Sequence, residues 1–210
     1  MGCLCMRDPM WRLFKIFVFT LLLAAATAAG IVLWRSQDPL YTAQEWLAGG
    51  RYARYDTLIA DLAEKHGLDP LLLRSVVWRE SAFHTDKIGS AGERGLMQVG
   101  EAAAQDWAKA EKIETFTTTD LFDAKTNMEA GTWYLRKALD RWQARDRPEV
   151  FALAEYNAGR RRVDRWLEET RLGDKANGDD LLGAIDFPTT RKYVEEILRR
   201  KNFYKEQQHR

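Results

Sequence analysis

The sequence contains almost no cysteine. Cys3 and Cys5 are the only two cysteines among 210 residues, and both stand within the first five positions. The remainder therefore cannot be a disulfide-stapled scaffold or a domain folded around a cysteine-ligated metal. Proline and glycine are also scarce, with 5 and 14 copies respectively. Such a composition excludes collagen-like and low-complexity chains and is typical of a globular protein.

An excess of basic residues is lacking as well. Lysine and arginine number 32 against 31 aspartates and glutamates, which gives a net charge of +1. A nucleic-acid-binding domain needs a basic footprint, so we expect no nucleic-acid partner. The near-zero total is an average over two unlike parts. Residues 1–35 hold four basic side chains and one acidic one, whereas residues 36–210 hold 28 basic and 30 acidic side chains.

The basic first part contains a long apolar run. Residues 16–33 carry no charge and are almost wholly apolar. A helix of this length is about 27 Å long, close to the thickness of the hydrocarbon core of a bilayer. Trp11 and Trp34 flank the run, where tryptophan suits the membrane interface. Three basic residues precede the run and Arg35 follows it, which predicts a cytoplasmic N-terminus.

These features predict a membrane anchor ahead of the main body. The segments are a cytoplasmic segment 1–15, a transmembrane signal-anchor 16–34, and a linker with a first short helix 35–55. The alternative is a cleaved signal peptide, for which Ala26-Thr27-Ala28 supplies a small-residue cleavage site. Cleavage near Ala28 would release the body into the periplasm. The apolar run continues past that site to Leu33, which favours the uncleaved anchor.

The body is predicted to be helical. From Tyr41 onward no stretch alternates polar and apolar residues as a half-buried strand does. Gly67 is a typical stop for a helix, and Asp69-Pro70 supplies an N-cap followed by proline at the first helical position. We predict one all-α domain over residues 56–210. Its expected helices cover residues 56–66, 70–80, 123–142, 148–158, 161–169 and 188–204, with a polar stretch at 173–180.

One acidic residue stands on an apolar helix face. The core-facing spacing i, i+3, i+4, i+7 is occupied by Leu73, Val76, Val77 and Glu80. Burial removes water from a carboxylate and raises its pKa, so that it can hold a proton near neutral pH and act as a general acid. The alternative from this spacing alone is that Glu80 ends the helix at the rim and pairs with an arginine.

Short motifs accompany this carboxylate along the chain. They are Glu80-Ser81, a Gly/Ser-rich loop at 89–92, Gly95-Leu96-Met97-Gln98-Val99, Ala154-Glu155-Tyr156-Asn157-Ala158-Gly159, and Pro188-Thr189-Thr190-Arg191-Lys192-Tyr193-Val194. In this order and spacing they resemble the catalytic domain of the soluble-type lytic transglycosylases. That domain is similar to the family 23 glycosidases and shares its fold with goose-type lysozymes. Asn127 to Gly131, with Tyr134-Leu135, is similar to the central helix of that family. The resemblance covers about residues 58–204 and implies a lysozyme-like helical domain.

The resemblance implies cleavage of the β-1,4 bond between N-acetylmuramic acid and N-acetylglucosamine in bacterial peptidoglycan. Glu80 would first protonate the leaving oxygen as a general acid. It would then act as a base and accept the proton of the muramic acid C6 hydroxyl, which closes a 1,6-anhydro ring. A nucleophile within the substrate has a high effective concentration, so Glu155 and Asp86 are not expected to be essential as a second catalytic carboxylate.

The same resemblance assigns substrate contacts. We expect peptidoglycan glycan strands to meet Ser81, Ser90, Gln98, Glu155, Tyr156, Asn157 and Tyr193. The hydroxyl of Tyr193 is expected near Glu80, while Met97 packs beneath the cleft. No cofactor or metal is expected, because the three histidines His66, His84 and His209 lack ligand spacing.

The loop after Glu80 departs from the family pattern. Thr85 stands where the family usually has proline, and Glu93 stands where it usually has a small residue. The family usually has serine at or next to Gly89, and Ser90 is the nearest candidate in this chain. Gly100-Glu101 also stands near a position where proline is common. These departures affect the expected details of substrate binding rather than the assignment of Glu80.

Two other functions stay open. One is a true muramidase, as in goose-type lysozymes, in which water attacks the sugar and leaves a reducing end. The other is a membrane-tethered peptidoglycan-binding or assembly protein without catalysis, against which the intact Glu80 argues. With peptidoglycan as substrate, the expected location is the bacterial inner membrane, as a single-pass protein with a periplasmic catalytic domain. Such an enzyme suits general wall turnover or the opening of a local gap for cell-envelope machinery.

Overall fold

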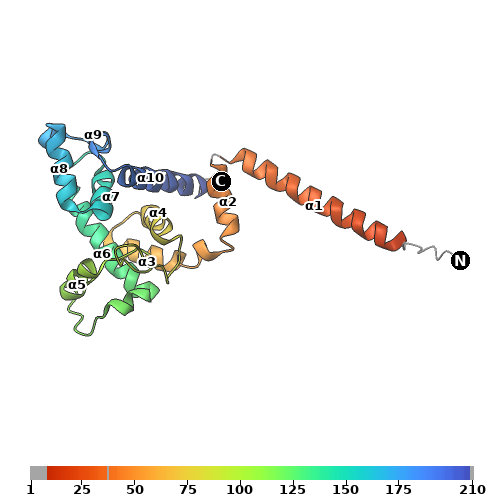
Figure 1. The fold of residues 1–210 in the computed structure, drawn as a ribbon, viewed down its shortest axis with the longest axis horizontal. Coiled ribbons are helices and arrows are strands. Elements are labelled where there is room, and N and C mark those ends of the chain that lie inside the picture. The colour runs from red at the N-terminus through yellow and green to blue at the C-terminus, as the bar shows by residue number, and fades with distance from the viewer. Residues whose placement is uncertain (1–8, 37, 209–210) are drawn as a thin grey trace. The chain divides into compact units, whose positions relative to one another are not determined.

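The computed structural model describes residues 9–36 and 38–208, and Figure 1 shows that they form helices joined by loops. Two compact units are present, Met1–Ala48 and Gly49–Arg210. Most of the predicted cytoplasmic segment 1–15, including both cysteines, lies outside the described residues. Within the described residues, strand-like pairing is limited to two isolated bridges, Ile88 with Arg94 and Arg94 with Val99. The predicted all-α class is therefore confirmed.

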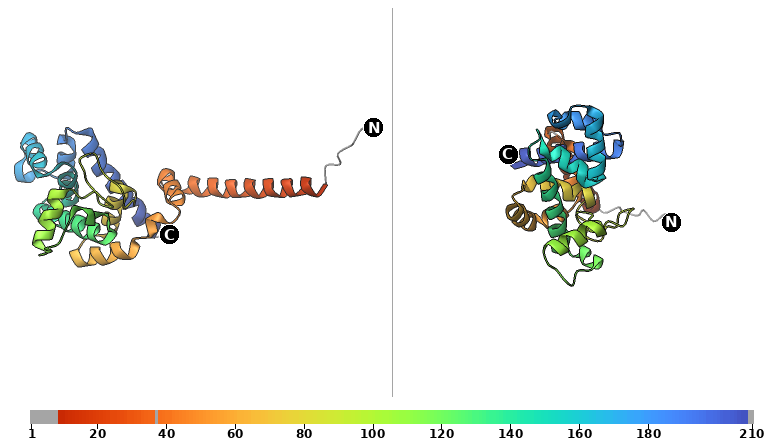
Figure 2. Two further views of the ribbon diagram at one scale, coloured as in Figure 1. Left: turned by 60° about the horizontal axis from the view of Figure 1, so that its bottom comes forward. Right: turned by 90° about the vertical axis from the view of Figure 1, so that its left-hand side faces the viewer.

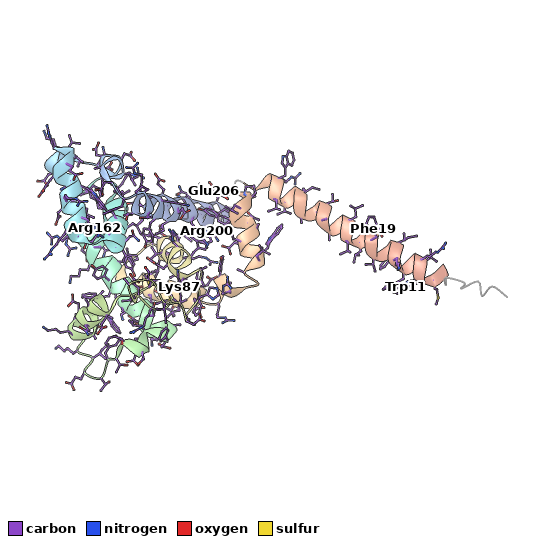
Figure 3. All side chains as sticks on the ribbon, in the orientation of Figure 1. Trp11, Phe19, Lys87, Arg162, Arg200 and Glu206 are labelled. Carbon is purple, nitrogen blue, oxygen red and sulfur yellow. The ribbon has the colours of Figure 1, made fainter. Side chains whose placement is uncertain are left out.

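The first unit contains the long helix α1 (Pro9–Arg35) and the short helix α2 (Pro39–Leu47). The helix α1 includes the whole predicted span and is long and apolar enough to cross a membrane, a property that a signal sequence near an N-terminus shares. Figure 3 shows the side chains of Trp11 and Phe19 standing away from α1, and Phe19 is 66% exposed. The helix α2 begins where Asp38 accepts the N–H of Tyr41 at 3.1 Å.

The second unit holds the remaining helices. They are the 3₁₀ helix η1 (Arg51–Ala53), α3 (Asp56–His66), α4 (Pro70–Ser81), α5 (Glu101–Ala110), η2 (Thr118–Phe122), α6 (Ala124–Trp142), α7 (Pro148–Ala158), α8 (Arg160–Thr170), η3 (Gly173–Lys175), α9 (Gly178–Ala184) and α10 (Pro188–Gln208). All six predicted helices of the body are present. The helices α5 and α9 and the three 3₁₀ helices were not among them.

Local capping explains where the predicted helices start and stop. Asp69 accepts the N–H of Leu71 at 2.8 Å and begins α4, and Asp123 accepts the N–H of Thr126 at 2.8 Å and begins α6. These bonds satisfy backbone donors that have no partner within the helix. Gly67 ends α3 in a left-handed conformation with φ of 61°, which glycine adopts without steric cost.

The packing of α10 brings together helix ends that are far apart in the sequence. The helix α10 packs along α4 and α7, while α6 contacts α3, α5 and α7 (Figures 1 and 2). Fully buried apolar side chains fill the space between these helices, among them Leu73, Val76, Met128, Phe151, Leu153 and Ile197. The ends of α4 and α7 and the first turns of α10 are thereby brought together, although they are far apart in the sequence.

Candidate active site

Glu80 lies in the last turn of α4, on the face that points into the core. The preceding positions of this face are fully buried and are occupied by Leu73, Val76 and Val77. Glu80 itself is half-buried and lines a cavity. The helix ends one residue later, and Ala82 has a left-handed backbone with φ of 48°. The predicted apolar stripe therefore directs a carboxyl group toward a cavity rather than toward the surface.

A tyrosine of α10 holds this carboxyl group. The Tyr193 hydroxyl donates a hydrogen bond of 2.6 Å to Oε1 of Glu80, and Tyr193 is buried. The two residues are 113 positions apart and meet because α10 packs along α4. The neighbouring arginine, Arg79, places Nε 2.8 Å from Oε2 of Glu196. A simple rim ion pair between Glu80 and an adjacent arginine, the alternative left open by spacing alone, is therefore not what the geometry shows.

Burial of the Glu80 carboxyl group raises its pKa to about 7. The Tyr193 hydrogen bond and the positive charges of Arg79 and Lys87 lower this pKa, whereas the negative charge of Glu93 raises it. The loss of water outweighs the opposing contacts. A carboxyl group with this pKa is partly protonated near neutral pH, so it can both give a proton and take one back.

The loop between α4 and α5 brings Gln98 to the same cavity. Its backbone is left-handed with φ of 48°. The side-chain Nε2 donates to the backbone oxygens of Lys87 and Gly95, both at 3.1 Å. Because these bonds use the donor side of the amide, Oε1 is left as an acceptor beside Gly89, which also lines the cavity.

A buried asparagine of α6 holds this loop from beneath. Oδ1 of Asn127 accepts the N–H of Met97 at 2.8 Å. Its Nδ2 donates to the backbone oxygens of Arg94 at 2.7 Å and Leu121 at 2.9 Å. Asn127 and Met97 are both fully buried, which agrees with the expectation that Met97 packs beneath the cleft. The Asn127 side chain thus connects α6 to the loop at Arg94 and Met97 and to Leu121 of η2.

Two residues at the end of α7 complete the wall. The Tyr156 hydroxyl donates to the backbone oxygen of Met97 at 2.9 Å, and burial raises the pKa of this phenol, so it stays protonated. Oδ1 of Asn157 accepts the hydroxyl of Thr190 on α10 at 2.8 Å. Both contacts connect α7 to other elements and hold the two side chains at the cavity.

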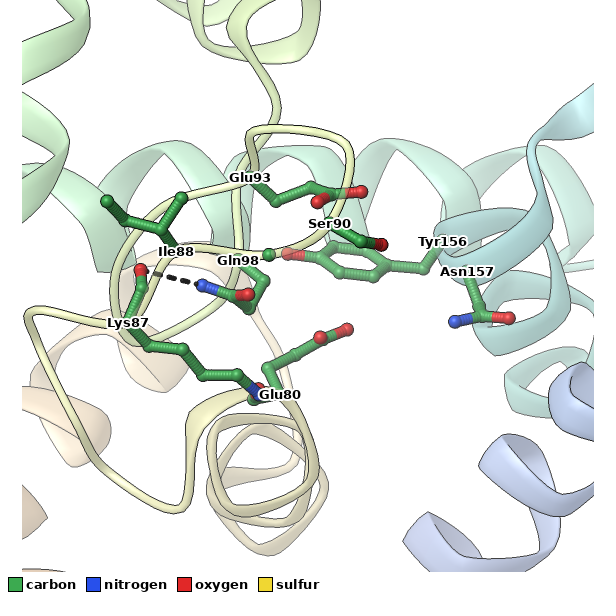
Figure 4. Close-up of a pocket in the computed structure, with 9 residues that line it drawn as sticks. Glu80, Lys87, Ile88, Ser90, Glu93, Gln98, Tyr156 and Asn157 are labelled. Atoms are coloured by element: carbon green, nitrogen blue, oxygen red, sulfur yellow. Dashed lines mark hydrogen bonds between the residues drawn. The ribbon is translucent and has the colours of Figure 1, made fainter.

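The cavity has a volume of about 410 Å³. Figure 4 shows its lining residues, which are Glu80, Lys87, Ile88, Gly89, Ser90, Glu93, Gln98, Tyr156 and Asn157. A second hollow of about 200 Å³ shares Glu93, Gln98 and Tyr156 with the first. The two hollows therefore form one interrupted groove in which the shared residues stand at the junction.

Most of the sequence-predicted site residues meet in this groove. Ser90, Gln98, Tyr156 and Asn157 line the same cavity as Glu80, and Tyr193 reaches it through its bond to Glu80. Ser81 is not a lining residue of this cavity. Its hydroxyl donates to the backbone oxygen of Val77 at 3.3 Å, and Ser81 is buried. Its position thus supports packing of the helix end rather than contact with a substrate.

Glu155 also lies away from the cavity, in contrast to the expected substrate contact. It is 3% exposed, forms an ion pair with Arg141, and accepts the indole N–H of Trp142 at 2.7 Å. Successive residues of an α-helix point about 100° apart. Because Tyr156 faces the cavity, its neighbour Glu155 faces α6 instead.

Four lining residues were not predicted as site residues, namely Lys87, Ile88, Gly89 and Glu93. Lys87 donates from Nζ to the backbone oxygen of Glu80, while Ile88 and Glu93 lie on the same loop. An irregular loop has no periodicity from which the direction of a side chain can be inferred. The one signal available for Glu93 was its departure from the family pattern.

Among residues 9–36 and 38–208, no group of three histidine, cysteine, aspartate or glutamate side chains is placed to hold a metal ion. Nδ1 of His84 lies 3.9 Å from Oδ1 of Asp86, and Nε2 of His66 lies 3.5 Å from Oε2 of Glu129. His209 lies outside the described residues.

Comparison with known proteins identifies the family. The model of the Transglycosylase SLT domain family matches residues 57–178, more than half of the chain. This segment includes Glu80 and the other residues that line the cavity, whereas Tyr193 lies beyond it. Membrane-bound lytic murein transglycosylase F from Desulfosudis oleivorans is 33% identical over 112 residues, which cover 52% of this chain and 23% of that protein.

Two further relatives cover more of this chain. The X polypeptide of Escherichia coli K12 is 31% identical over 149 residues, or 65% of this chain and 83% of that protein. The solved structure of the 70-kDa soluble lytic transglycosylase from Escherichia coli superposes with a TM-score of 0.62 at 27% identity, over 71% of this chain and 24% of that one. This chain thus spans less than a quarter of either named transglycosylase. The extent of these matches and the shared helical architecture show that this chain belongs to the transglycosylase SLT domain family, with its lysozyme-like fold.

Proposed function

We propose that this protein is a lytic transglycosylase that cleaves the β-1,4 bond between N-acetylmuramic acid and N-acetylglucosamine in peptidoglycan. The observation that supports this most is Glu80, a carboxyl group with a pKa of about 7 that lines a cavity and is oriented by Tyr193. The relatives named above as lytic transglycosylases support the substrate class.

In the first step Glu80 acts as a general acid. Its proton moves to the glycosidic oxygen, the bond between that oxygen and the anomeric carbon breaks, and positive charge develops on the muramic acid ring. The Glu80 carboxylate left behind is negative and lies beside this charge. The hydrogen bond from Tyr193 lowers the pKa of Glu80 and so favours release of the proton.

In the second step Glu80 acts as a base. The C6 hydroxyl oxygen of the same sugar forms a bond with its own anomeric carbon and gives its proton to Glu80. The product is a 1,6-anhydro ring, no water is consumed, and Glu80 regains the proton with which it began. A nucleophile within the substrate needs no activated water or second carboxylate.

The remaining groove residues are suited to holding amino sugars. Gln98 offers Oε1 as an acceptor, since its Nε2 is bonded to the loop backbone. Asn157 offers Nδ2 as a donor, since its Oδ1 is bonded to Thr190. Together they present an acceptor and a donor, which the N–H and C=O of N-acetyl groups require. Tyr156 adds a ring and Ser90 a hydroxyl at the same cavity.

The products released from purified peptidoglycan test this function. We expect the muropeptides to end in 1,6-anhydromuramic acid, which mass spectrometry separates from the reducing form because it is one water lighter. A reducing muramic acid as the primary product would show that water is the nucleophile and the protein is a muramidase. Binding to peptidoglycan without any cleavage would favour the non-catalytic tethering protein instead.

We also propose that α1 is an uncleaved anchor in the bacterial inner membrane and that the catalytic domain is periplasmic. The exposed apolar surface of α1 and its length support a membrane span. The apolar run extends to Leu33, beyond the candidate cleavage site at Ala28. The intact mass of protein extracted from membranes is expected to include α1. A mature N-terminus at Ala29 in a soluble periplasmic fraction would contradict the anchor.

A further inference from the structure

Glu93 places a second carboxylate in the cavity that holds Glu80. Figure 4 shows the two side chains extending from opposite sides of the group of lining residues. Oε2 of Glu93 accepts the backbone N–H of Ala91 at 3.0 Å, and its backbone oxygen accepts the N–H of Gly89 at 2.7 Å. The loop therefore holds this carboxylate in a defined place. The mechanism proposed above makes no use of it.

The position of Glu93 depends on the absence of a side chain at Gly89. A Cβ atom at position 89 would overlap Oε2 of Glu93 and lie 2.8 Å from Oε1 of Gln98. The Glu93 side chain therefore occupies space that a side chain at position 89 would need.

Glu93 also stands at the junction of the two hollows. The larger one contains Glu80, and the smaller one is lined by Val99, Gly100, Ala103 and Tyr134 together with the three shared residues. A polymer that occupies both hollows must pass Glu93. Sugar rings carry many hydroxyl and N–H donors, and a carboxylate is an acceptor for several of them.

We propose that Glu93 is a second, substrate-contacting carboxylate of this active site, which accepts a hydrogen bond from a hydroxyl or amide N–H of the amino sugar bound beside Glu80. This inference rests on the proposed function for the identity of the sugar polymer. It assigns Glu93 to the place that a side chain at position 89 would otherwise take. A hydrogen bond to a charged acceptor is stronger than one to a neutral acceptor.

The binding test uses the Glu80→Gln background, so it does not depend on cleavage. The probe is the β-1,4-linked tetramer of N-acetylglucosamine, and its dissociation constant is measured by calorimetry. We expect Glu93→Ala to weaken binding by about tenfold, the loss expected for one hydrogen bond to a charged group. An unchanged dissociation constant would overturn the proposal. Failure of the wild type to cleave peptidoglycan would contradict the proposed function alone.

A double-substitution cycle tests whether a side chain at position 89 and the Glu93 carboxylate compete for the same space. We expect Gly89→Ser to weaken binding by about tenfold when Glu93 is present, because the new side chain displaces the carboxylate. In the Glu93→Ala protein the serine still meets Oε1 of Gln98, but the closer contact with the carboxylate is gone, so we expect a clearly smaller further loss. Equal losses from Gly89→Ser in both proteins would show that Gly89 is needed for another reason and would overturn this competition for space.

A charge-specific measurement tests whether the Glu93 carboxylate acts on Glu80 in the cavity, apart from its support of the loop. Glu93→Gln keeps an acceptor for the N–H of Ala91 but removes the charge that raises the pKa of Glu80. Arg79, Lys87 and Tyr193 still lower that pKa, so the alkaline limb of the cleavage rate is expected to move to lower pH while the melting temperature is unchanged. A limb that stays in place would contradict an effect of the Glu93 charge on Glu80.

Discussion

Glu80→Gln is expected to abolish cleavage of peptidoglycan and, at alkaline pH, to make the folded protein more stable. The amide has nearly the same shape and can still accept the hydrogen bond from Tyr193, which is 2.6 Å in the wild type. It cannot give a proton to the leaving oxygen or take one from the attacking hydroxyl. Loss of general acid and base catalysis lowers the rate by about 10³-fold or more, measured as soluble muropeptides released from purified cell walls.

Glu155→Gln is the matched control for this substitution. It changes the same chemical group at a buried position, but Glu155 pairs with Arg141 and Trp142 rather than lining the cavity. We expect it to lower the free energy of unfolding by about 1–3 kcal/mol while cleavage continues. An active Glu80→Gln protein, or an equally large loss of cleavage in Glu155→Gln, would contradict the assigned roles.

The gain in stability expected for Glu80→Gln follows from the pKa of Glu80, which burial raises from its ordinary value of 4.5 to about 7. The folded protein binds this proton more tightly than the unfolded chain does. Its contribution to stability is therefore complete below pH 4.5 and is lost as the pH rises toward 7. Between pH 5 and pH 8 the free energy of unfolding of the wild type is expected to fall by about 2–3 kcal/mol through this group, a loss that the neutral glutamine does not undergo. Urea unfolding at pH 5 and pH 8 measures this, and an equal difference between the two proteins at both values would contradict it.

Helix boundaries with a local chemical cause were predictable from the sequence. Gly67, Asp69-Pro70 and Asp123 stop or start helices through their own backbone or side chains, so neighbouring residues contain the needed information. The helix α9 was not predicted, because the polar composition of residues 173–180 is typical of a turn. In the structure Asn177 and Asp180 form a reciprocal capping box that begins this short helix.

The candidate site was predictable where a helix face defines direction. The spacing of the stripe before Glu80 raised the possibility of an inward carboxyl group beside that of a rim ion pair, and the neighbouring motifs favoured the inward position. The contact between Tyr193 and Glu80 spans 113 residues and was expected only from the family resemblance. Contacts of this kind depend on how α10 packs along α4, which no local pattern specifies. The position of Lys87 at the cavity depends likewise on a loop whose backbone is set by distant contacts.

Asn127→Ala is expected to have the largest effect on stability of any single substitution among the residues that hold the loop between α4 and α5. The side chain is fully buried and makes three hydrogen bonds, to Met97, Arg94 and Leu121. Alanine leaves the N–H of Met97 and the oxygen of Leu121 buried without this partner, whereas the oxygen of Arg94 still accepts the N–H of Val99 at 3.0 Å. Each such group costs about 1–3 kcal/mol, so we expect the free energy of unfolding to fall by about 3–5 kcal/mol, as measured by urea denaturation.

The same substitution is expected to reduce cleavage in the molecules that remain folded. Gln98 follows directly after Met97, whose N–H is 2.8 Å from Oδ1 of Asn127, so release of this bond frees the backbone that positions the Gln98 amide. We expect kcat/KM to fall by at least about tenfold, the cost of misplacing a substrate-positioning group. Because Glu80 and Tyr193 belong to α4 and α10, their hydrogen bond and the pH at which the rate declines are expected to remain.

Asn177→Ala is the matched control, since it removes another asparagine that bonds to backbone N–H groups. Oδ1 of Asn177 accepts the N–H of Asp179 at 2.8 Å and of Asp180 at 3.0 Å, and water can reach this helix end after the change. Loss of an N-cap costs about 1 kcal/mol, and cleavage is expected to be unaffected. If Asn127→Ala were no more destabilising than this variant, the amide would not be what holds the loop. If it were destabilising but fully active, the loop would not position Gln98 for substrate.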